Sequence, residues 1–154
     1  MHTVILITGP SDGVGLEAAK SLYSRGRHIL LHGRSDTKLK AAKKALSRLS
    51  GDGRVESYPA DLSRMAELET LGAAIVANHE RLDIVITNAG VFRTAVTFTD
   101  DGPHIRFAVN TFAPYLLTQR LLPLLRPGAR VVNLSSAAQS PVNLEALAGR
   151  ARIT

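Results

Sequence analysis

One stretch of sequence decides the fold of this 154-residue chain: VILITGPSDGVG, residues 4–15. Its first four residues form an apolar run typical of a buried strand, and residues 16–22 that follow read as a helix. The glycines at positions 9, 13 and 15 allow a tight turn and let a ligand approach the backbone. Because backbone N–H groups and the positive end of the helix dipole meet at such a turn, the stretch predicts a phosphate-binding loop.

Strand and helix patterns alternate from this loop to the end of the chain. Strands are expected at Thr3–Thr8, His28–His32, Val55–Pro59, Ile84–Thr87 and Val131–Leu134, and helices at residues 14–24, 37–50, 63–78 and 103–125, the last ended by Pro127-Gly128. This βαβ alternation predicts the α/β class, with about five strands in a three-layer, doubly wound parallel sheet of the Rossmann type. We expect one domain, residues 1–154, whose tail from Ala137 to Thr154 is loop-like and adds no strand, so that the fifth strand is an exposed edge.

The net charge of +6 does not by itself predict a nucleic-acid partner. The lysines between residues 38 and 48 alternate with Leu39, Ala42 and Leu46, which is typical of the solvated face of an amphipathic helix. A positive field also attracts an anionic cofactor. We expect no nucleic acid as a partner.

The absence of cysteine excludes disulfides, thiolate metal sites and cysteine nucleophiles, and it fits a reducing compartment. No apolar run approaches the roughly 18 residues of a membrane span, and the N-terminal run is too short for a signal peptide. His28 and His32 lie four apart on an expected strand without a third ligand nearby, so no metal site is expected. These features predict a cytoplasmic protein without a membrane partner.

The spacing of the glycine loop is Thr-Gly-x3-Gly-x-Gly, which resembles the short-chain dehydrogenase/reductase family. It differs from the Gly-x2-Gly-x2-Gly spacing of the epimerase-like branch of that family. The resemblance implies that the loop binds the pyrophosphate of a nicotinamide dinucleotide. The residues that it assigns to this role are Thr8, Gly9, Ser11, Asp12, Gly13, Val14 and Gly15.

Arg34 follows the second expected strand, 19 residues after Gly15. At this place in a dinucleotide-binding fold, an acidic residue binds the ribose 2′-OH of NAD, whereas an arginine accommodates the 2′-phosphate of NADP. The planar guanidinium suits a phosphate, so Arg34 predicts NADP in preference to NAD. The alternative is that Asp36 reaches the ribose of NAD instead.

Two further segments resemble cofactor contacts of the family. Asp61-Leu62 resembles the pair that binds the adenine, although Asp-Leu-Ser before a helix is also ordinary capping chemistry, with Asp61 or Ser63 near the N-cap. The segment Thr87–Gly90 resembles the family's Asn-Asn-Ala-Gly, with Thr in place of the first Asn, and implies that Asn88, Ala89 and Gly90 lie beside the cofactor. The substituted threonine keeps a hydrogen-bonding group, and Asn88 has a side chain that can tie neighbouring strand ends together.

Two residues match catalytic positions of the family. Asn110 matches the asparagine whose main-chain carbonyl holds a water of a proton relay, and Ser136, with Ser135 as the adjacent alternative, matches the serine that hydrogen-bonds the reacting carbonyl or alcohol. Pro114 has no N–H, so in a helix the carbonyl of Asn110 would lose its partner and the helix would kink. Alternatively, Pro114 begins a new helical segment.

The general acid/base of the family, the tyrosine of a Tyr-x3-Lys motif, has no counterpart here, because the tyrosines are residues 23, 58 and 115 and the last lysine is Lys44. The final strands of the family fold are also absent, so the chain resembles an N-terminal part truncated before that motif. We therefore predict the cofactor-binding part of an NADP(H)-dependent oxidoreductase. It would transfer hydride between the nicotinamide and a small-molecule carbonyl or secondary alcohol, and these residues would have no activity alone.

An alternative from another class is a non-catalytic dinucleotide-binding or interaction module that naturally ends here. For a complete family member, the resemblance also implies a homo-oligomer. The sequence does not name the substrate.

Overall fold

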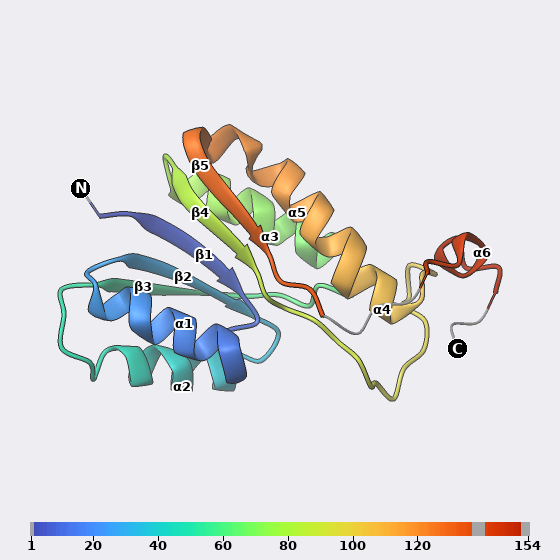
Figure 1. The fold of residues 1–154 in the computed structure, drawn as a ribbon, viewed down its shortest axis with the longest axis horizontal. Helices are drawn as coiled ribbons and strands as arrows, with labels where there is room; N and C mark the ends of the chain where they lie inside the picture. Colours follow the sequence, from blue (N-terminus) through green and yellow to red (C-terminus); the bar gives the residue numbers. More distant parts are fainter. Residues whose placement is uncertain (1, 137–140, 152–154) are drawn as a thin grey trace.

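A five-stranded parallel sheet in the order β3-β2-β1-β4-β5 lies between two layers of helices (Figure 1). The computed structural model describes residues 2–136 and 141–151. The strands are β1 (Val4–Thr8), β2 (His28–Gly33), β3 (Arg54–Pro59), β4 (Leu82–Thr87) and β5 (Leu125–Asn133). The helices are α1 (Gly13–Ser24), α2 (Asp36–Leu46), α3 (Met65–Asn78), the short α4 (Ile105–Phe107), α5 (Ala113–Leu121) and the short α6 (Leu144–Leu147). The predicted doubly wound α/β class is confirmed.

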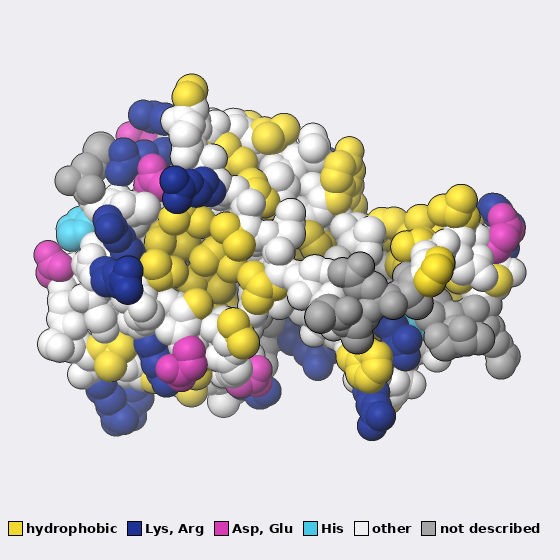
Figure 2. All heavy atoms as spheres, in the orientation of Figure 1, with side chains coloured by type: hydrophobic (Ala, Val, Ile, Leu, Met, Phe, Trp, Pro, Cys, Tyr) yellow, Lys and Arg dark blue, Asp and Glu magenta, His cyan; other side chains and the backbone are white. Residues whose placement is uncertain are grey.

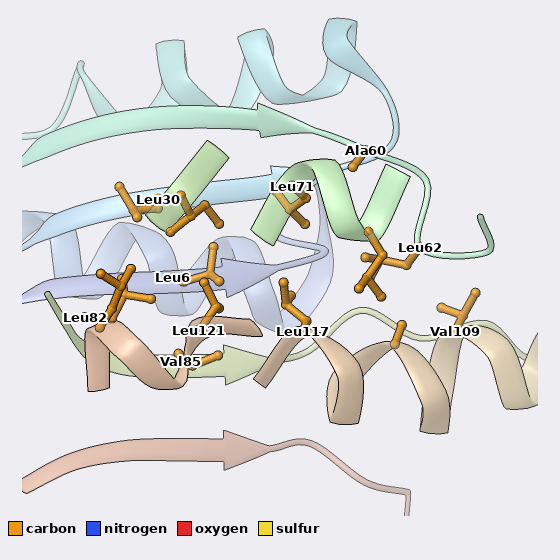
Figure 3. Close-up of a cluster of buried hydrophobic side chains, with 14 of the residues drawn as sticks. Leu6, Leu30, Ala60, Leu62, Leu71, Leu82, Val85, Val109, Leu117 and Leu121 are labelled. Atoms are coloured by element: carbon orange, nitrogen blue, oxygen red, sulfur yellow. The ribbon is translucent and has the colours of Figure 1, made fainter. Parts of the chain in front are cut away.

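Alternate residues of β1 enter two separate hydrophobic cores. Ile5 and Ile7 pack with buried residues of α1 and α2 on one face of the sheet. Leu6 points to the other face, where it joins residues of α3 and α5, among them Leu71 and Leu117 (Figure 3). Because both faces of this central strand are covered, it is apolar without interruption, as buried parallel strands are.

The end of the chain differs most from the sequence-based expectation. The expected helix over residues 103–125 consists of α4, a π-helical turn η1 (Ala108–Phe112), α5 and a 3-10 turn η2 (Leu122–Leu124). β5 begins at Leu125, six residues before the expected start, so Pro127-Gly128 lies within the strand. The register accounts for this difference: Leu82 pairs with Leu125 but Ile84 pairs with Arg130, so the proline and glycine occupy an irregular step that leaves the neighbouring pairs intact.

Strand β5 lies at one edge of the described sheet. Its Val131 and Val132 are 38% and 44% exposed, and Leu134, which follows the strand, is 44% exposed. On the face that carries α1 and α2, β4 contributes Ile84 and Ile86, which are only half-buried. Figure 2 shows a hydrophobic patch on this face, over β1 and β4. The described helices therefore cover this face less completely at β4 than at β1 and β2.

A side-chain contact ties the carboxyl end of β1 to the carboxyl end of β4. The Thr8 hydroxyl oxygen accepts hydrogen bonds from the backbone N–H of Asn88, at 3.1 Å, and of Ala89, at 3.0 Å. The Asn88 side-chain amide in turn donates to the carbonyl oxygens of Thr8, at 3.0 Å, and Gly9, at 2.9 Å. These four bonds join segments about 80 residues apart and place the glycine loop beside Asn88 and Ala89.

A buried histidine connects β2 to the end of β3. His32 is 2% exposed, and its Nε2 lies 3.0 Å from the carbonyl oxygen of Ala60. Because a carbonyl can only accept, Nε2 carries the hydrogen. Burial lowers the pKa of His32 from its ordinary value of 6.5 to about 4, since the charged imidazolium would lose its hydration there. His32 is therefore neutral at pH 7.

Replacing Thr8 tests the tie between β1 and β4. Thr8→Val keeps the shape of the side chain but leaves two N–H groups without an acceptor, so we expect the free energy of unfolding to fall by about 2–4 kcal/mol. Thr8→Ser keeps the hydroxyl and loses one methyl group, which costs about 1 kcal/mol. Urea unfolding measures both. Equal losses for the two variants would show that the hydroxyl does not matter.

The buried His32 predicts a loss of stability in acid. Its folded pKa lies below its unfolded pKa, so stability from this residue is complete above pH 6.5 and is lost as the pH falls towards 4, by about 3 kcal/mol in total. His32→Gln retains a donor for Ala60 but does not titrate. We expect the difference in unfolding free energy between wild type and His32→Gln to change over this pH interval. Parallel urea-derived curves from pH 7.5 to 4.5 would contradict the assignment.

Candidate functional site

The first of two adjoining cavities lies at the carboxyl ends of β1 to β4 and has a volume of about 620 Å³. It lies between the glycine loop and the segments that follow β2, β3 and β4. The predicted cofactor residues that line it are Gly9, Ser11, Asp12, Gly13, Val14, Arg34, Asp61, Leu62, Asn88, Ala89 and Gly90. Thr8 and Gly15, which were also predicted as cofactor contacts, are buried behind the lining and support it.

Two glycines let the loop pack closely against the segment after β4. Gly9 has a φ of +67°, and a Cβ there would lie 2.8 Å from the Ala89 Cα. A Cβ on Gly15 would clash with the side-chain amide nitrogen of Asn88. Both positions therefore need a glycine, the first for its backbone conformation and its close contact and the second for the contact alone.

The segment after β2 contributes a cation to this cavity. Arg34 is exposed and lines the cavity, and no ion pair joins it to an acidic side chain within residues 2–136 and 141–151. Ser35 is the N-cap of α2, where its hydroxyl accepts from the N–H of Lys38 at 3.3 Å. The carboxylate of Asp36 forms an ion pair with Lys40, one turn further along α2, and Asp36 does not line the cavity.

Asp61 combines a place in the cavity wall with a local structural role. Its Oδ1 accepts from the N–H of Ser63, at 2.9 Å, and from the Ser63 hydroxyl, at 2.7 Å. Asp61 and Ser63 lie just before the N-cap of α3, which is Arg64 and makes no side-chain capping bond. The first N–H of that helix, at Met65, donates instead to Asp101 across 2.9 Å, a contact 36 residues away in sequence.

The second cavity, of about 1,020 Å³, holds the predicted catalytic residues Asn110 and Ser136 as well as the alternative, Ser135. Five residues line both cavities: Asn88, Ala89, Gly90, Val91 and Leu134. The two cavities are therefore neighbours that share the segment after β4 as a common wall. The hydroxyl of Thr87 ties this wall to β5 by donating to Asn133 Oδ1 at 2.6 Å, so the threonine keeps a strand-linking bond.

Asn110 lies in the π-helical turn η1. The N–H of Ala113 donates to the carbonyl of Ala108, five residues earlier, so the helix widens just before Pro114 in the first turn of α5. The sequence allowed either a kink in the helix at Pro114 or a new helical segment that begins there. The structure has both, because η1 distorts the helix and α5 begins directly after it. The Asn110 side chain pairs with Val91, accepting from its N–H and donating to its carbonyl, each at 2.8 Å.

Several cavity residues were missed by sequence reasoning, among them Lys38 and His32. Lys38 belongs to the basic stretch that was interpreted as a solvated helix face, and the structure confirms that face: Leu39, Ala42 and Leu46 are the buried residues of α2. Its position three residues after the N-cap Ser35 was the available signal, because the first turn of α2 begins at the same edge of the sheet as the glycine loop.

Neither a metal centre nor a membrane span is found in the part of the chain that the structure describes. No group of three or more His, Cys, Asp or Glu side chains there is arranged to hold a metal ion. No helix among those residues is both long and apolar enough to cross a membrane.

Comparison with known proteins gives the same family for sequence and fold. Retinol dehydrogenase 13 of Homo sapiens is 36% identical over 136 residues, which cover 87% of this chain and 41% of that protein. The chloroplastic short-chain dehydrogenase TIC 32 A of Brassica napus is 32% identical over 146 residues, or 90% of this chain and 46% of that protein. The chain thus spans less than half the length of these curated relatives.

This chain is similar to a solved structure of a metagenomic short-chain oxidoreductase in complex with NADP, with a TM-score of 0.76 and 30% sequence identity. The match covers 96% of this chain and 71% of that one. The family described as short chain dehydrogenase matches residues 3–146, nearly the whole sequence. This chain therefore belongs to the short-chain dehydrogenase family.

Proposed function

We propose that this chain is the cofactor-binding part of an NADP(H)-dependent oxidoreductase that acts on a small-molecule carbonyl or secondary alcohol. The observation that carries the proposal is the pair of adjoining cavities. One is lined by the glycine loop, Arg34 and Asp61, and the other by Asn110 and Ser136, with the segment after β4 between them. A dinucleotide that lies along the first cavity brings its nicotinamide end to the second.

The choice of NADP over NAD rests on charge. Arg34 lines the cavity and is not engaged by an acidic side chain in the described part of the chain, so its planar guanidinium is available to a 2′-phosphate. Asp36, the residue that would favour NAD, is turned away in its ion pair with Lys40. The similar metagenomic oxidoreductase was solved with NADP, which supports the same choice.

We assign the following roles in binding and catalysis to residues of this chain. Backbone N–H groups of residues 11–15 bind the pyrophosphate at the start of α1. Asp61 would accept from the adenine amine through its second carboxylate oxygen, because its first oxygen already accepts from Ser63. The Ser136 hydroxyl donates to the substrate oxygen and stabilises the charge that grows there during reaction. When bound, the nicotinamide supplies or accepts the hydride.

We further propose that the 154 residues bind the cofactor but do not turn it over. They contain no Tyr-x3-Lys pair to exchange a proton with the substrate oxygen. A non-catalytic dinucleotide-binding module remains the second candidate, and it is favoured by the same observation. A transcript that continues past the codon for Thr154 into a Tyr-x3-Lys motif would favour the oxidoreductase, whereas a stop codon would favour the module.

Replacing Arg34 tests the cofactor assignment. Arg34→Ala removes a charge-assisted contact, so we expect the Kd for NADP+ to rise by about 10- to 100-fold and the Kd for NAD+ to change by less than about twofold. Lys43→Ala is the matched control, because Lys43 lies in the last turn of α2, lines neither cavity and forms no ion pair within the described residues, so its removal leaves the Asp36–Lys40 pair intact. Calorimetric titration measures both constants. An equal effect of the two substitutions on NADP+ would overturn the assignment.

The expected lack of turnover is tested with the purified 154-residue chain. We expect NADPH fluorescence to show binding, while absorbance at 340 nm shows no NADPH oxidation above the blank with a panel of aldehydes and ketones. The expectation fails if oxidation occurs and Ser136→Ala abolishes it, because these residues would then contain a working proton donor.

A further inference from the structure

We propose that Lys38 and Asp12 together tune the preference of this site for a 2′-phosphorylated dinucleotide. This inference rests on the proposed function, since it concerns the same cavity. Lys38, in the first turn of α2, places its Nζ 3.3 Å from Oδ2 of Asp12 in the glycine loop. The contact joins two segments 26 residues apart, and both residues line the cavity next to Arg34 and Ser35.

Asp12 places a negative charge on the cavity wall, and Lys38 neutralises this charge. Its side chain makes no capping bond to α1, although aspartate is a favoured N-cap residue, so the carboxylate is directed elsewhere. A carboxylate on the wall of a cavity that receives a phosphate would repel it. The ammonium of Lys38 neutralises this charge and leaves Arg34 as the excess cation at this end of the cavity.

Lys38 is also able to move from Asp12 to a ligand. The two side chains are 62% and 75% exposed, and ion pairs this exposed are weak, so little is lost when the ammonium leaves. The root of the lysine is fixed, because its N–H is bonded to Ser35, while its long side chain has three donors at a flexible end. A 2′-phosphate bound at Arg34 can therefore recruit Lys38 without a change in α2.

The other lysines do not line the cavity beside Asp12 and Arg34. Among the five lysines, all within the described part of the chain, Lys38 is the one that lines the cavity. Lys40 pairs with Asp36 on the outer surface of α2, and Lys20 pairs with Glu17 on α1. Lys43, in the last turn of α2, is exposed, lines neither cavity and forms no ion pair within the described residues. Removing Lys43 therefore changes the net charge as much as removing Lys38 does, but leaves the cavity lining and the Asp36–Lys40 pair intact.

The experiment compares two probes that differ only in the 2′-phosphate: 2′,5′-ADP and 5′-AMP. With Lys38→Gln, we expect the Kd for 2′,5′-ADP to rise by about 10-fold, because a donor is lost and Asp12 is no longer neutralised. With Asp12→Asn, it should fall by about threefold, because the repulsion is removed. The Kd for 5′-AMP should change by less than about twofold in both variants.

The double variant separates the two roles of Lys38. In the Asp12→Asn background, Lys38→Gln should cost only about threefold in 2′,5′-ADP binding, since no carboxylate is then exposed. Lys38→Arg should restore binding to within about twofold of wild type, because it restores the positive charge. Unchanged 5′-AMP binding by Lys38→Gln checks that this variant is folded. Lys43→Gln is the matched control.

Two failures are distinguishable. If wild type does not prefer 2′,5′-ADP, or if Arg34→Ala affects both probes alike, the proposed NADP function is wrong. If wild type prefers 2′,5′-ADP through Arg34, two results would overturn the role assigned to Lys38 and Asp12. One is an equal effect of Lys38→Gln and Lys43→Gln. The other is the same cost of Lys38→Gln with aspartate and with asparagine at position 12.

Discussion

The site depends on one hydroxyl group, that of Thr8. By accepting from two successive N–H groups at the end of β4, it fixes the glycine loop against the segment that separates the two cavities. The glycines at positions 9 and 15 are needed because this contact is so close, and Asn88 returns two bonds across it. Without this tie, the glycine loop and the wall shared by the two cavities would lose their relative placement.

The fold was predictable from sequence wherever a local signal and the packing agreed. The continuous apolar runs of β1 and β2 identified buried parallel strands, and the alternation with helices identified the α/β class. The start of β5 was not predictable, because Pro127-Gly128 has the same local meaning at the end of a helix and in an irregular strand. The pairing with β4 decides between them, and no short window of sequence contains it.

In the candidate site, too, some features were predictable from local sequence and others depend on tertiary packing. The spacing of the glycine loop and of Arg34 predicted that they share one site, and the structure brings them together in the first cavity. Lys38 was not predicted, since a lysine on an amphipathic helix looks the same whether it faces water or the mouth of a cavity. The burial of His32 likewise comes from β1 and β3, which flank it in the sheet, and its hydrogen bond is to Ala60 just after β3. Local motifs thus suggest the kind of ligand, whereas tertiary packing decides which additional charges surround the cavity.

The span of the Thr8 contact has a consequence for the order of folding. The bonds between β1 and β4 close a loop of about 80 residues, and such a closure costs chain entropy that must be offset by the surrounding packing. Strand β2 can pair with β1 after only one short crossover, so we expect the docking of β4 to come later. The glycine loop has its complete wall only after that step. A nucleotide bound as proposed would stabilise the chain by holding this long-range closure together, and during refolding its binding would recover only once β4 has docked.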